Sequence, residues 1–520
     1  MSFPPGIIYL SKLLPGLLIP PVGSYLLKWF FQVYFKLSTP HWMVVPLCSL
    51  SLPVAFTAKI LYHLYARCRE AAVHGAVLPP TLPSSIGGID LLLSSLRDTS
   101  SDAPGEPLAV LAKRMGHTYS MHVLFEDRFH RGMTCPFFKC NRISDFELFN
   151  CHLELAITQF KKCLHEGYPV DFQDMILCFA MDSSGEFLFG HYAKTLSAGL
   201  PYPFYAPPSM TTARSHSLSA FAAALLETQL VSAMHGLFGT SWPLLEFWKD
   251  RIKVPMAVIH KFMDPILTEA VAKKHANVGG GVVAMKAAHA DRKVQEGETL
   301  VEHLLNYTED RTILRDKILN ISLVGRDTVH SLSSACLLTF VIYMLAKHSD
   351  VLGMLRAEIL STVGSSRAPT PNDFRDMKYM RAVLNETLRL YPPVSTTQLV
   401  ILPSTTGGKP FYIPVNSNQT VTPNPFIFLP FNTGPRICLS QQFTYHEASF
   451  FLVRLLQQFL GISLALDVQP ADSRVPEAWA QDNELGWKAG EKLRVKNHLT
   501  MYIAGGLWVN MQEAVTADVV

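Results

Sequence analysis

The segment PFNTGPRICLSQQF, residues 430–443, places Cys438 directly before an apolar stretch with helical spacing. Phe431, Gly434 and Arg436 precede it in the pattern FxxGxRxC. By chance, such a match is expected about once in a thousand chains of this length. A cysteine at the start of a helix can bind a metal as a thiolate, because backbone N–H groups and the helix dipole both favour the anion. The pattern therefore constrains this region to a tight loop followed by a helix.

We expect that helix over residues 439–460. Gly434 would permit a turn that is closed to residues with a side chain, and Phe431 would shield the sulfur from water. For Cys438 alone, a buried and inert cysteine in a turn is the commoner outcome. The three accompanying positions favour a metal ligand instead.

The composition excludes few functions. The chain has 520 residues and a formal net charge of +3, and no block of Lys and Arg resembles a nucleic-acid-binding patch. Nucleic acid is therefore not an expected partner. The nine cysteines are scattered without a CxxC pair, which indicates reduced thiols rather than a disulfide framework.

The first 75 residues predict a membrane anchor. Residues 6–35 are apolar, with lysines at two positions, and residues 42–65 form a second apolar run that Pro46, Pro53 and Lys59 interrupt. About 20 apolar residues are needed to cross a bilayer, so one or two membrane segments are expected. An apolar arm lying in the membrane interface is the alternative. Basic residues flank both sides, so charge does not predict the orientation.

A proline-rich spacer, residues 77–88, follows the apolar runs and predicts a domain boundary near residue 76. Residues 1–75 would then be the anchoring part and residues 76–520 the folded domain. Most of residues 143–459 have helical spacing, which predicts a mainly α fold.

Residues 315–347 predict one long helix that contains Gly325, Asp327 and Thr328. A glycine would permit local widening of the helix, and an adjacent acid and alcohol could carry protons into an apolar pocket. Taken alone, Asp327 and Thr328 would more often face solvent or bond back to their own helix. Further along, Glu386 and Arg389 in NETLRLYPPV form an ExxR pair, which alone would be a surface ion pair.

In this order, the GxDT, ExxR and FxxGxRxC motifs resemble the cytochrome P450 superfamily over residues 76–520. The sequence segments around these motifs, such as GEFLFG, SAGLPYP and NPFIFLPFNTGPRICL, are similar to those of fungal membrane-bound alkane and fatty-acid hydroxylases. The resemblance implies the helical prism of that superfamily, with small β-sheets and an N-terminal membrane anchor. It also implies haem b as cofactor, with Cys438 as the axial ligand of the iron.

The same resemblance implies roles for the other motif residues. Phe431, Gly434 and Arg436 would complete the haem-binding loop, with Arg436 beside a haem propionate. Asp327 and Thr328 would organise protons, and Glu386 with Arg389 would be structural.

The implied activity is hydroxylation of long-chain apolar substrates with O2. No flavin or nicotinamide fingerprint is present, so electrons would come from a separate NADPH-cytochrome P450 reductase. The expected location is the endoplasmic reticulum membrane, with the folded domain in the cytosol and lipid as a further partner.

Two departures from the family pattern support an alternative function. The chain is shortened near residues 420–421, where relatives carry an arginine that joins the Glu386 and Arg389 pair. It is also shortened near residues 126–127, where His130 and Arg131 remain as haem-contacting candidates but a tryptophan is replaced. A buried pair left without its third member would destabilise the fold. The alternative is a catalytically impaired, membrane-anchored remnant.

Two smaller expectations concern the end of the chain. Ser440 stands where the family has glycine, so its hydroxyl would either cap the following helix or crowd the haem edge. The segments HLTMYIA and LWVNM, joined by Gly505 and Gly506, predict a hairpin of paired strands.

Overall fold

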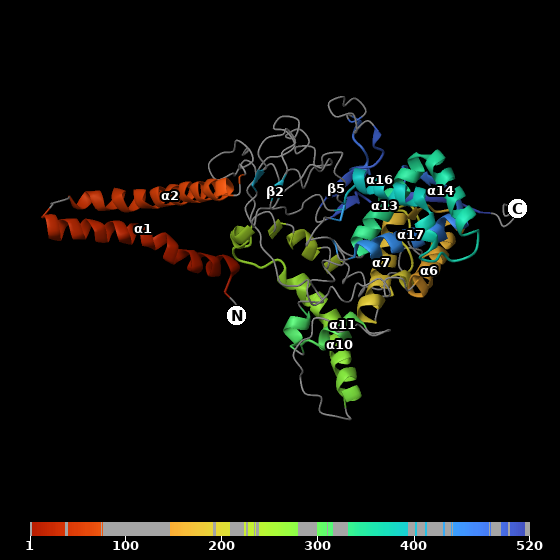
Figure 1. Ribbon diagram of the computed structural model, residues 1–520, viewed down its shortest axis with the longest axis horizontal. Helices are drawn as coiled ribbons and strands as arrows, with labels where there is room; N and C mark the ends of the chain where they lie inside the picture. Colours follow the sequence, from red (N-terminus) through yellow and green to blue (C-terminus); the bar gives the residue numbers. More distant parts are fainter. Residues whose placement is uncertain are drawn as a thin grey trace.

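The computed structural model describes residues 3–36, 40–73, 75, 146–190, 194–207, 223–224, 227–232, 234–235, 239–278, 299–308, 310–315, 331–393, 401–402, 411–412, 430–431, 438, 440–477, 479, 490–497 and 500–514. Within these residues the chain is mainly helical, with three small sheets and two long N-terminal helices, and the predicted fold class is confirmed. Its shape is a folded body from which the N-terminal helices project (Figure 1).

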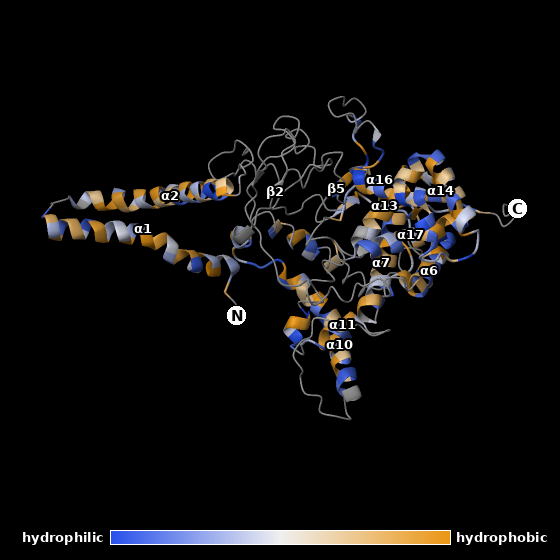
Figure 2. Ribbon diagram, in the orientation of Figure 1, coloured by the Kyte–Doolittle hydropathy of each residue, from blue (hydrophilic) through white to orange (hydrophobic). Residues whose placement is uncertain are grey.

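The projecting part consists of α1 (Pro5–Phe35) and α2 (Val44–Val73). Both helices are long and apolar enough to cross a membrane. The sequence predicted interrupted runs, yet α1 continues through three prolines and α2 through Pro53. Hydrophobic residues recur along both helices (Figure 2), and their side chains are largely exposed, which is the pattern expected of a surface that lipid covers.

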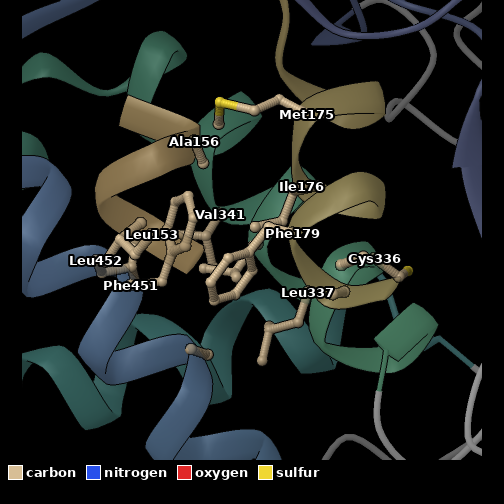
Figure 3. Packing of buried hydrophobic residues seen from close by; sticks show 14 of the residues in the cluster. Leu153, Ala156, Met175, Ile176, Phe179, Cys336, Leu337, Val341, Phe451 and Leu452 are labelled. Carbon is tan, nitrogen blue, oxygen red and sulfur yellow. The ribbon is translucent and has the colours of Figure 1, made fainter. Parts of the chain in front are cut away.

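The core of the folded body is built around α13 (Ser331–Lys347). This helix is apolar on all sides, so it can be stable only where other elements surround it. It contacts α7 (Phe172–Phe189), α16 (Lys378–Leu390) and α17 (Gln441–Gln458). Val341 of α13 belongs to this core together with Phe179 and Phe451, whose ring centroids lie 5.1 Å apart (Figure 3).

Two further helices enclose the core. Helix α6 (Phe146–His165) places its apolar face on α7 and α17, where the ring of Phe146 stacks on that of Phe450 at 5.2 Å. Helix α14 (Ser349–Thr362) carries Glu358, whose carboxylate accepts hydrogen bonds of 2.8 Å from two backbone N–H groups in the first turn of α16. That carboxylate satisfies donors that a helix N-terminus leaves unpaired, so it fixes the start of α16.

The remaining helical elements of the described residues are distributed along the chain. They are η1 (His41–Met43), η4 (Leu196–Ala198), η5 (Gly239–Leu244), α10 (Lys253–Val278), α11 (Leu300–Leu305), α15 (Asp373–Asp376) and η8 (Ala471–Ser473).

The largest sheet has the strand order β1-β7-β4 and joins distant parts of the chain. All neighbours are antiparallel, with Val170 of β1 (Val170–Asp171) opposite Val509 of β7 (Trp508–Glu513) and Ile462 of β4 (Phe459–Leu464) opposite Met511. The other two sheets pair β2 (Ile401–Leu402) with β3 (Phe411–Tyr412) and β5 (Val495–Asn497) with β6 (Met501–Ile503).

The predicted hairpin around Gly505 and Gly506 is wrong, since β6 pairs with β5 while β7 pairs with β4 and β1. The physical reason is Asp171, the N-cap of α7, whose Oδ1 accepts a 3.0 Å hydrogen bond from the backbone N–H of Leu507. Gly506, at φ 86°, lies so close that an added Cβ would be 2.1 Å from an Asp171 oxygen. This contact directs the chain away from β6 and into the other sheet.

Candidate functional site

Cys438 lies at the end of a closed loop just before α17, as the sequence predicted. Its backbone N–H donates a 2.8 Å hydrogen bond to the carbonyl oxygen of Phe431, which closes the loop between these two residues. The Phe431 side chain is 8% exposed and packs against Tyr445 of α17, with ring centroids 5.1 Å apart. Cys438 itself is half-buried and packs against the hydrophobic core.

Ser440 is the N-cap residue of α17, and its side chain makes no capping hydrogen bond. Its hydroxyl oxygen lies 3.3 Å from the sulfur of Cys438 instead. The Ser440 side chain therefore does not cap α17, which was one of its two expected roles. Ser440, which stands where the family has glycine, thus places a hydroxyl group beside the candidate ligand Cys438.

Glu386 and Arg389 form the expected ion pair on α16, with two hydrogen bonds of 2.8 and 2.6 Å between guanidinium and carboxylate. The pair is exposed, with 56% of the Glu386 side chain and 47% of the Arg389 side chain open to solvent. The hydrogen bonds from Arg389 lower the pKa of Glu386. The pair lies at the surface, as its spacing alone predicted, and not in the buried position that the resemblance implied, because α16 places Leu384, Thr387 and Leu388 in the core and turns this pair outward.

The other candidate residues lie outside the described part of the chain. These are Asp327, Thr328, Gly434, Arg436, His130 and Arg131. Helix α13 begins at Ser331, shortly after Thr328, and ends at Lys347 as predicted for the long helix. The roles proposed for these six residues stay predictions, as does the domain boundary near residue 76.

Glu447 is a buried residue that the sequence analysis missed. It lies on α17, is 1% exposed and accepts a 3.1 Å hydrogen bond from the hydroxyl of Ser183 on α7. Burial raises the pKa of Glu447 to about 8. A signal was available, because Glu447 is a lone acid inside the apolar stretch of residues 443–456.

A second unexpected group of polar residues joins three distant segments. Glu491 accepts hydrogen bonds from the hydroxyls of Tyr343 at 2.5 Å and Tyr391 at 2.6 Å. Tyr343 belongs to α13, and Tyr391 directly follows α16. Burial, with the negative charge of Glu491 nearby, raises the pKa of both tyrosines. The hydroxyls therefore remain protonated donors that tie the chain before β5 to the helical core.

A cavity of about 600 Å³ opens between α15, α16 and α17. Arg375, Lys378 and Arg381 contribute its charged groups, and the guanidinium of Arg381 lies over the ring of Tyr445. Of the candidate site residues that the structure describes, neither Cys438 nor Phe431, Glu386 or Arg389 lines this cavity.

The donor set decides which metal group the site fits. Within the described ranges, no cluster of three or more His, Cys, Asp or Glu residues could hold a bare metal ion, which needs several protein ligands. Haem iron receives its equatorial ligands from the porphyrin and needs only one axial ligand from the protein. A single sulfur on a closed loop ahead of a helix therefore fits haem.

Comparison with known families gives a match over most of the chain. A family model described as Cytochrome P450 matches residues 126–422 and 415–473. The match is in two parts that meet at residues 415–422, the region in which the sequence predicts a shortening.

Several fungal proteins are similar in sequence. Cytochrome P450 monooxygenase himC of Aspergillus japonicus is 29% identical over 402 residues, covering 70% of this chain and 65% of that protein. Cytochrome P450 52A5 of Candida maltosa is 30% identical over 382 residues, covering 64% of this chain and 66% of that protein. The chain thus spans slightly less than two thirds of the length of these relatives.

A solved structure shares the fold. The crystal structure of the cytochrome P450DA haem domain superposes on this chain with a TM-score of 0.50 at 17% identity. The match covers 76% of this chain and 79% of that domain. At this identity the likeness describes architecture alone.

Proposed function

Because the chain belongs to the cytochrome P450 family, whose cofactor is haem, we propose that it is a membrane-bound haem-thiolate monooxygenase that hydroxylates long-chain apolar substrates. The observation that carries the proposal is the closed loop in which the Cys438 backbone N–H bonds to the carbonyl of Phe431. This loop holds one sulfur at a fixed position ahead of α17, which is what a single axial ligand requires.

Each residue of the loop has a distinct task in this proposal. Cys438 supplies the thiolate, and the start of α17 favours its negative charge. We assign to Phe431 the exclusion of water from the sulfur, and its own side chain is buried against Tyr445. Gly434 and Arg436 complete the loop, and we assign the guanidinium of Arg436 to a haem propionate.

A haem bound through a thiolate supplies O2 activation and the insertion of one oxygen atom into a C–H bond. We assign proton delivery for this reaction to the carboxyl of Asp327 and the hydroxyl of Thr328. His130 and Arg131 are further candidates for contacts with the propionates. Electrons would come from a separate NADPH-cytochrome P450 reductase.

Two features support an apolar substrate and a membrane location. The motifs resemble those of fungal alkane and fatty-acid hydroxylases, and fungal proteins are among the similar relatives. The two apolar helices α1 and α2 would hold the enzyme at the bilayer, where such substrates dissolve. We place the protein in the endoplasmic reticulum membrane, with its folded domain in the cytosol.

One observation favours a second function. The pair of Glu386 and Arg389 is exposed, and the sequence predicts a shortening near residues 420–421, where the family carries the third residue that joins such a pair. A chain unable to retain haem would be a membrane-anchored helical scaffold.

A reduced carbon-monoxide difference spectrum of the full chain, expressed in membranes, separates the two functions. The proposed enzyme gives the Soret band of a thiolate-bound haem, and Cys438→Ala abolishes it. Cys151→Ala is the matched control, because Cys151 is an exposed thiol on α6 and should leave the band unchanged. Absence of any haem in the wild-type chain would favour the scaffold. If the haem binds, hydroxylated products from a long-chain alkane and a fatty acid then test the substrate class.

A further inference from the structure

The N-terminal helices α1 and α2 pack side by side and run in opposite directions (Figure 1). The thiol of Cys48, near the start of α2, lies 3.6 Å from the carbonyl oxygen of Pro21 in α1. The two helices therefore form one hairpin, and their connection lies at the end remote from the folded body.

Each helix is long enough to cross the bilayer separately. The stretch from Lys12 to Lys28 in α1 is about 24 Å long, and that from Val44 to Tyr65 in α2 is about 32 Å, at 1.5 Å per residue. The hydrocarbon core is about 30 Å thick, and lysines near its edges can extend their charged ends to the surface. Both helices are thus long enough for the hairpin to cross the bilayer twice.

The beginning of α1 is attached to the folded body. The backbone N–H of Gly6 donates a 3.1 Å hydrogen bond to the carbonyl of Phe247, and the hydroxyls of Tyr9 and Ser241 lie 3.2 Å apart. The contact depends on glycine, since a Cβ at Gly6 would be 2.2 Å from the Phe247 ring.

From these contacts we infer that residues 5–73 form a transmembrane hairpin whose two outer ends lie on the same side of the bilayer as the folded domain. The connection between α1 and α2, around residues 36–43, lies on the opposite side. A single crossing by α1 is incompatible with the contact between Gly6 and Phe247, because it would place the start of α1 across the bilayer from η5.

The surroundings of the contact fit a position at the lipid surface. Leu244, Leu245 and Trp248 are exposed next to it, and 74% of the Trp248 side chain is open. Tryptophan is enriched where bilayer and water meet. At the other end of the hairpin, Trp42 is exposed beside the connection and suits the opposite interface.

Three epitope tags test the topology in sealed membrane vesicles treated with protease. One tag is placed at each end of the full chain and one in a flexible insert between Ser38 and Thr39. The expected result is that the protease removes both terminal tags or neither, and that the inserted tag has the opposite fate. Terminal tags of opposite response would overturn the inference in favour of one crossing. Three tags of equal response would overturn it in favour of helices lying in the interface.

Cross-linking tests the attachment of α1 itself. Tyr9→Cys with Ser241→Cys should be joined by a short bis-maleimide, detected after the chain is cleaved between them, and Ser241→Cys alone is the background. Adding Gly6→Leu should abolish the cross-link, because the added side chain displaces Phe247. Gly16→Leu is the matched control on the same helix, since a Cβ there meets nothing within 4 Å. Equal cross-linking in both variants would contradict the contact, and no cross-linking in the parent pair would overturn the inferred hairpin.

Discussion

The hydroxyl of Ser440 lies 3.3 Å from the sulfur of Cys438, within range of a hydrogen bond that the family's usual glycine cannot make. A donor beside a thiolate ligand withdraws electron density from the sulfur. In a haem-loaded chain, this withdrawal would favour the reduced iron and weaken the donation of electrons to bound oxygen.

Ser440→Gly should therefore lower the reduction potential of the bound haem, roughly by tens of millivolts. Ser440→Thr keeps a hydroxyl and should stay closer to the wild type. Spectroelectrochemical titration measures both variants. A potential unchanged in Ser440→Gly would show that the hydroxyl does not donate to the sulfur.

The loop and its helix were predictable because both depend on local sequence. The motif spacing places Cys438 before a helix, and α17 begins at Gln441, two residues after the predicted start. The predicted end is two residues too late, because residues 459 and 460 belong to strand β4, which pairs with β7. That pairing joins segments far apart in the chain, which local periodicity does not report.

The pair of Glu386 and Arg389 should contribute little to stability. Both side chains are about half exposed, and solvent-exposed ion pairs typically contribute about 1 kcal/mol or less. We expect Glu386→Gln and Arg389→Gln each to lower the free energy of unfolding by no more than that, as measured by urea denaturation of the full chain in detergent. A loss of several kcal/mol would indicate a buried network instead.

Burial and strand pairing account for what the sequence could not predict. The spacing of Glu386 and Arg389 predicts their contact, but only the packing of α16 decides that they face solvent. Gly505 and Gly506 predict a turn, whereas Asp171, more than 300 residues away in sequence, determines which strands that turn connects. Both outcomes depend on contacts between distant segments.

Phe451 should be among the most sensitive core positions. Its side chain is fully buried, and its ring contacts those of Phe172 at 5.9 Å and Phe179 at 5.1 Å. Phe451→Ala should cost about 3–5 kcal/mol through lost burial and the cavity left behind. Leu466→Ala, at an exposed position, is the control and should cost less than about 1 kcal/mol. The urea midpoints of the two variants check this contrast, and similar losses would contradict the placement of Phe451 in the core.

Glu447 should make the protein less stable as the pH rises. Its pKa is about 8 in the folded chain against an ordinary value of 4.5, so between these values the folded chain holds a proton that the unfolded chain has released. The free energy of unfolding should then fall by about 1.4 kcal/mol per pH unit over this interval and level off above pH 8. Glu447→Gln cannot ionise and keeps an oxygen that can accept from Ser183, so it should flatten this dependence.

Urea denaturation near pH 5 and pH 7.5 measures the effect of Glu447. The stability of Glu447→Gln relative to the wild type should increase by a few kcal/mol between these two pH values. Glu386→Gln is the control, because the pKa of Glu386 is lowered and the group stays ionised throughout the interval in both states. Its stability relative to the wild type should be the same at both pH values. If the relative stability of Glu447→Gln is also constant, Glu447 is ionised in the folded chain, and the α7–α17 packing around it must admit water.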